Sequence, residues 1–68
     1  MAVIKVIEVL GNSTVSFENA VQNVIDDASK SVKNIKSVYM QDMQVTVKNN
    51  KIEEFRVATK VSFGILDD

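Results

Sequence analysis

Apolar and polar residues alternate most regularly in the last third of the chain. From residue 55 onward, one row of alternate positions is apolar apart from one threonine: Phe55, Val57, Thr59, Val61, Phe63 and Ile65. A period of two is typical of a β-strand that buries one face. Asn49 and Asn50 precede this strand, and asparagine tolerates left-handed dihedral angles. They predict a hairpin that joins it to an earlier strand over 35–47.

The first segment, 2–10, is rich in β-branched residues and is apolar on both faces. Val3, Ile7 and Val9 lie on one face, and Ile4, Val6 and Leu10 lie on the other. The second face therefore needs a cover, which a partner subunit would supply, although proteins also tolerate some exposed valines. Gly11, Asn12 and Ser13 are expected to end this strand.

The segment that follows has apolar residues at steps of three and four, which predicts an amphipathic helix. Its apolar stripe is Phe17, Ala20, Val21, Val24, Ile25, Ala28 and Val32. Ser13 and Ser16 are both good N-caps, and the pattern does not choose between them. Lys30 and Lys33 suit the negative pole of the helix, and Asn34 is expected to end it.

The expected order is therefore β-α-β-β, in a single α+β domain over 1–68. The 35–47 strand has apolar residues on both parities, which predicts a bulge or a change of partner along its length. A right-handed crossover would leave a gap between the first two strands, and the last strand would fill it antiparallel to both. We expect a three-stranded antiparallel sheet with the last strand at its centre and the helix on one face.

Composition excludes several kinds of site and partner. The 68 residues include no cysteine and no histidine, which excludes disulfides, zinc-finger sites and the common thiolate and imidazole mechanisms. The formal net charge of −1 gives no reason to expect nucleic acid or membrane as a partner. We expect a cytoplasmic, non-enzymatic protein. Because so short a chain has a small core, self-association is a plausible source of stability.

Three carboxylates are candidate oxygen ligands for a metal ion: Glu8, Asp42, and Glu53 or its neighbour Glu54. Calcium takes six to eight oxygen ligands, which a single short chain does not easily supply. At a subunit interface or symmetry axis the number of ligands multiplies. The alternative is that these residues are surface charges that provide solubility.

With this order of elements, the chain resembles a dodecin over essentially its whole length. The resemblance lies in Lys5-Val6-Ile7-Glu8-Val9-Leu10-Gly11-Asn12-Ser13 and in the segment from Val57 to Phe63. It implies a homododecamer in which each three-stranded sheet wraps around its helix, and flavins are bound in stacked pairs where subunits meet. Such an assembly would cover the second face of the first strand.

The resemblance also identifies two flavin-equivalent pocket positions, Ser37 and Arg56. Flavin-binding members have a stacking tryptophan at the first and a hydrogen-bonding glutamine at the second. Serine has no aromatic face, and arginine cannot accept a hydrogen bond. We therefore expect weak or no flavin binding.

Another branch, the calcium dodecins, looks more similar to this chain. This similarity rests on Gln41-Asp42-Met43, Lys51-Ile52, Phe55-Arg56 and Val61-Ser62-Phe63. It implies a shell that stores or buffers calcium, with Asp42 the first candidate ligand. The alternatives are a riboflavin- or FMN-binding storage dodecin and a small module that adds its sheet edge to a different protein.

Overall fold

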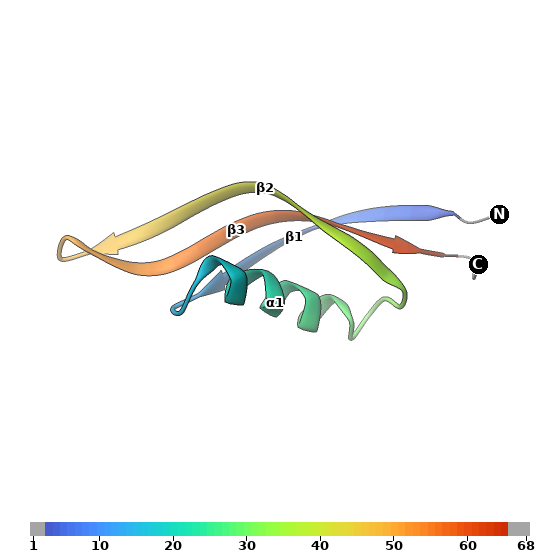
Figure 1. The fold of residues 1–68 in the computed structure, drawn as a ribbon, viewed down its shortest axis with the longest axis horizontal. Helices are drawn as coiled ribbons and strands as arrows, with labels where there is room; N and C mark the ends of the chain where they lie inside the picture. The colour runs from blue at the N-terminus through green and yellow to red at the C-terminus, as the bar shows by residue number, and fades with distance from the viewer. Residues whose placement is uncertain (1–2, 66–68) are drawn as a thin grey trace.

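The computed structural model describes residues 3–65, which form one helix and a three-stranded sheet. The elements are β1 (Ile4–Ser13), α1 (Phe17–Ala28), β2 (Ile35–Lys48) and β3 (Lys51–Gly64). The strand order is β1-β3-β2, and β3 is antiparallel to both neighbours (Figure 1). This confirms the expected α+β fold with the last strand at the centre. Residue 2, the expected start of the first strand, lies outside the described residues.

Ser16 is the N-cap of α1, which resolves the choice that the sequence left open. Its Oγ accepts a hydrogen bond of 2.9 Å from the backbone N–H of Asn19. Ser13 instead shapes the turn before the helix. Its Oγ accepts from the N–H of Val15 and donates to the side-chain oxygen of Asn19. The two serines therefore act in sequence, one in the turn and one at the helix start.

The helix is shorter than the sequence predicted. It ends at Ala28, and the next backbone N–H groups bond back to the last carbonyls of the helix in tight turns. Val32 still packs against the core from this turn, so its apolar side chain extended the helical pattern beyond the helix. Lys30 and Lys33, which the predicted longer helix would have included, lie past the end of α1.

β1 is longer than predicted, because Gly11, Asn12 and Ser13 pair with β3 and do not end the strand. Gly11 lies where α1 comes closest to the sheet. A Cβ atom there would collide with Cγ2 of Val24 and would lie 2.9 Å from the carbonyl oxygen of Ala20. Glycine at this position allows the helix to pack closely, and it does not turn the chain.

The irregular pattern of β2 results from bulges, as the sequence indicated. Lys36 and Gln41 are extra residues of β2 that have no partner in β3. Glu53 is an extra residue of β3 that has no partner in β2. Each bulge changes the parity of the residues that follow it. The residues of β2 that share the helix side of the sheet are consequently Ile35, Val38, Met40, Met43, Val45 and Val47.

The core lies between α1 and one face of the sheet. Its buried residues are Ala20, Val24 and Ala28 of the helix and Val57, Thr59, Val61 and Phe63 of β3. Phe17 and Phe55 close one end of this core with an edge-to-face contact, their ring centroids 5.1 Å apart. The other face of the sheet has no helix over it, and we call it the helix-free face.

The molecule is long for its size. It measures 51 × 19 × 14 Å, and its radius of gyration is 13.8 Å, whereas a compact domain of this length would have about 11 Å. The β2–β3 hairpin extends well past the N-terminal end of α1 (Figure 1). Exposed apolar side chains include Ile4, Val6, Leu10 and Tyr39 on the helix-free face and Met43, Val47 and Ile52 toward the hairpin. In the described part of the chain, no helix is long and apolar enough to cross a membrane.

Candidate ligand-binding site

A hollow of about 370 Å³ lies on the helix-free face, and we call it the sheet hollow. Two rows of residues that run across the three strands line it on this face, namely Leu10–Ala58–Asp42 and Asn12–Arg56–Gln44. Gly11 and Val57 also line the sheet hollow. Each row takes one residue from β1, one from the central β3 and one from β2. The first row contributes apolar surface and one carboxylate, and the second row contributes amides and a guanidinium group.

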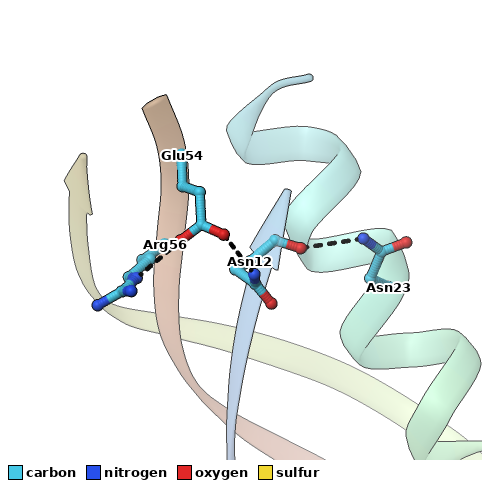
Figure 2. A network of polar contacts seen from close by, with 4 residues as sticks. All are labelled: Asn12, Asn23, Glu54 and Arg56. Carbon is cyan, nitrogen blue, oxygen red and sulfur yellow. Dashed lines mark hydrogen bonds and ion pairs between the residues drawn. The ribbon is translucent and has the colours of Figure 1, made fainter. Parts of the chain in front are cut away.

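Arg56 belongs to a short polar network that ends on the helix (Figure 2). Its Nε donates to Oε1 of Glu54 at 3.2 Å, and Oε2 of the same carboxylate accepts from Nδ2 of Asn12 at 3.0 Å. The backbone carbonyl of Asn12 in turn accepts from Nδ2 of Asn23 in α1 at 3.1 Å. The position of the arginine is therefore connected to both β1 and α1.

Four of the five predicted site residues share the helix-free face. Ser37, Asp42 and Arg56 lie there, as does Glu8. Ser37 and Asp42 have opposite parity in the sequence, and the bulge at Gln41 brings them to one side. All four are exposed in this chain.

The structure brings Asp42 and Arg56 together in the sheet hollow, but it does not bring Ser37 to them. Ser37 pairs with Ser62, six residues along β3 from Arg56, which is roughly 20 Å in an extended strand. A pocket that uses Ser37 and Arg56 together would have to take them from different subunits.

The three predicted metal ligands are also apart from one another in one chain. Glu8 lies opposite Lys60 in β3, Asp42 lies opposite Ala58, and Glu53 is the bulge residue near the hairpin end. Among residues 3–65, no three side chains of the metal-binding types are grouped so that they could hold an ion. A calcium ion at Asp42 would need further oxygen ligands from a neighbouring subunit.

The contact made by Glu54 is not predicted from the sequence. Glu53 and Glu54 are alternative candidates there, with Glu53 named first, yet Glu54 is the residue that contacts Arg56. The signal was available, because residues two apart in a strand lie on the same face. The bulge at Glu53 takes that residue out of the row that holds Glu54 and Arg56, and the alternation of apolar and polar residues in the sequence does not indicate it.

Comparisons with known proteins agree on the family and the fold. The model of the dodecin family matches residues 3–65. A dodecin from Streptomyces coelicolor superposes with a TM-score of 0.90 at 19% identity, covering 98% of this chain and 96% of that one. Calcium dodecin from Mycobacterium tuberculosis, described as a calcium-chelating immunodominant antigen, has 32% identity and a TM-score of 0.78, covering 90% of this chain and 87% of that one. No curated protein sequence matches the chain significantly.

Proposed function

Because the chain belongs to the dodecin family, we propose that it is a non-enzymatic shell of twelve identical subunits that binds a small ligand or ion where subunits meet. The observation that carries the proposal is the uncovered helix-free face. It exposes Val6 by 53% and Leu10 by 81% of their surfaces, on a molecule too elongated to cover them itself. Burial of such side chains between subunits would provide stability that the small core lacks.

Calcium is the first candidate for the bound ion. The 32% identical relative from M. tuberculosis is described as calcium-chelating, and Asp42 places a carboxylate in the sheet hollow. Neighbouring subunits would add the further oxygen ligands that calcium requires. In this role the assembly stores or buffers the ion.

Native mass spectrometry tests the assembly, and calorimetry with calcium chloride tests the ion. A dodecamer that binds calcium supports the proposal, whereas a stable monomer would overturn it. Asp42→Asn removes the charge at almost constant shape and should weaken calcium binding at least about tenfold. Asp26→Asn is the matched control on the exposed side of α1 and should leave binding unchanged.

Flavin is the alternative ligand, and Ser37 is the residue that argues against it. Titration of riboflavin should give weak or no fluorescence quenching, because serine offers no face on which the ring can stack. The double change Ser37→Trp with Arg56→Gln restores both residues that flavin-binding members use and should raise the affinity. If the affinity does not rise, the assignment of these two positions is wrong.

A further inference from the structure

We propose that the sheet hollow binds the oxyanion of a small acid, a carboxylate or a phosphate monoester, through the two terminal Nη groups of Arg56. We further assign Glu54 as the residue that positions this guanidinium group. The inference rests on the proposed function in one respect, which is that the sheet hollow is a ligand site. It adds the chemical class of the ligand and a positioning residue.

The hydrogen bond that Arg56 donates to Glu54 leaves the two terminal nitrogens of the guanidinium group free. Within residues 3–65, Arg56 donates a side-chain hydrogen bond from Nε, so the N–H groups of Nη1 and Nη2 remain for a ligand. These nitrogens lie on the side of the guanidinium group away from Asn12 (Figure 2). The side chain is 52% exposed. The planar fork of arginine matches the two oxygens of a carboxylate or phosphate in a bidentate pair.

Glu54 holds the fork in one orientation. One carboxylate oxygen accepts from Arg56, and the other accepts from Asn12, so the carboxylate is fixed from both sides. It is only 25% exposed, and the link from Asn12 to Asn23 extends the support to α1. An ion pair between exposed side chains adds little to folding stability. The main effect of this pair is to orient the arginine.

The rest of the sheet hollow fits the body of a small acid. Leu10 and Ala58 offer apolar surface beside the arginine, and the volume of about 370 Å³ is in the range of small-molecule sites. Asp42 is the diagonal cross-strand neighbour of Arg56, with the two Cα atoms roughly 7 to 8 Å apart. No ion pair joins these two residues in the described part of the chain. A ligand between them would pair its oxyanion with Arg56 and a hydroxyl or amine with Asp42.

The experiment compares three probes with one apolar body: phenyl phosphate, benzoate and benzyl alcohol. Each is titrated by calorimetry into the assembled wild-type protein in a calcium-free buffer without phosphate. At least one of the two acids should bind about tenfold or more tightly than the neutral alcohol, as a charge-assisted pair predicts. Comparison of the two acids distinguishes a carboxylate from a phosphate ligand. Arg56→Lys keeps the charge but loses the fork, and it should lose most of this preference.

Glu54→Ala distinguishes a positioning role of Glu54 from a purely electrostatic effect, because the two predict opposite changes in the affinity for the acid. Removal of a negative charge next to the site would strengthen acid binding if charge alone mattered. Loss of the orienting contact should instead weaken it several-fold, and Glu54→Gln, which keeps one acceptor oxygen, should recover part of the loss. Glu18→Ala removes an exposed carboxylate from α1, outside the sheet hollow, and is the matched control. It should leave acid binding equal to or slightly tighter than that of the wild type.

Equal affinities of the wild type for the three probes would overturn the proposal that the sheet hollow binds an oxyanion. Acid binding by Glu54→Ala that is as tight as in the wild type would overturn the positioning role. Either result can occur while native mass spectrometry still finds a dodecamer that binds calcium. Failure of this inference is therefore distinguishable from failure of the proposed function.

Discussion

The two faces of the sheet differ in what their side chains do, although the same three strands supply both. On the helix face, Val57, Thr59 and Val61 of β3 are at most 2% exposed and pack under α1. On the helix-free face, the alternate residues of the same strand include Arg56 and Ala58, which line the sheet hollow. One row of alternate side chains in β3 thus forms the core of the subunit. The other row places polar and charged groups on the face that is open to solvent or to a neighbouring molecule.

This difference shows how a short chain can keep its folding core and its candidate ligand site on separate faces of one sheet. The helix face alone provides the subunit core, which leaves the helix-free face free to carry polar groups. The apolar residues that remain on that face, such as Ile4, Val6 and Tyr39, have no cover in the subunit. Substitution of one face should therefore affect folding, and substitution of the other should affect assembly and binding.

The largest effect is expected from truncation of the same residue type on the two faces. Val61→Ala opens a cavity in the core and should lower the free energy of unfolding by roughly 2 to 3 kcal/mol. Val6→Ala should cost less in folding and should instead lower the fraction of assembled protein. Urea unfolding and native mass spectrometry at equal subunit concentration measure both effects. Equal losses of unfolding free energy would contradict the division between the faces.

Gly11→Ala tests the closest contact between the helix and the sheet. The added methyl group meets Val24 and the carbonyl of Ala20, so it should cost about 2 kcal/mol of unfolding free energy. The double variant with Val24→Ala removes the side-chain collision but not the backbone contact. Thermal unfolding should therefore show only partial recovery relative to Val24→Ala alone. A single variant as stable as the wild type would show that the helix can shift at no cost.

The smallest effect is expected from the replacement of two threonines that lie on opposite faces of the sheet, and it is a change in the free energy of unfolding. Thr59 is buried, and its Oγ1 donates a 2.7 Å hydrogen bond to the carbonyl of Val9, so Thr59→Val should cost about 1 kcal/mol. Thr46 shares the helix-free face with Glu54, and its buried Oγ1 has no hydrogen-bond partner in the described chain. Thr46→Val should be neutral or stabilising by up to about 1 kcal/mol. Urea unfolding measures both changes, and a clear loss for Thr46→Val would reveal a partner for that hydroxyl in the assembly.

The regular parts of the fold were predictable from the sequence, and the irregular parts were not. The alternation in β3 identified the row that packs under α1, because one-residue steps reverse the side of a strand, and the right-handed crossover identified β3 as the central strand. The end of α1 was overestimated, since Val32 is apolar and packs on the core from outside the helix. Gly11 was interpreted as a turn residue because its role in close packing depends on the position of α1.

For the candidate site, the sequence identified individual residues but not their grouping. Asp42 and Arg56 are neighbours in the sheet hollow, whereas Ser37 lies far along the sheet. The spacing between these positions depends on the bulges in β2, whose exact residues the mixed pattern did not indicate. Glu54 could have been selected by its two-residue separation from Arg56.

The bulge at Gln41 also determines how this chain would respond to the loss or gain of a codon. Deletion of Gln41 would join Met40 directly to Asp42, which already lie opposite consecutive residues of β3, so the ladder would be unbroken and every residue of β2 would keep its side. Deletion of a paired residue such as Tyr39, with the bulge kept at Gln41, would instead turn Val38 to the helix-free side and Ser37 toward the helix. A point substitution changes one side chain, whereas loss of a paired residue would exchange whole rows between the two sides of the sheet.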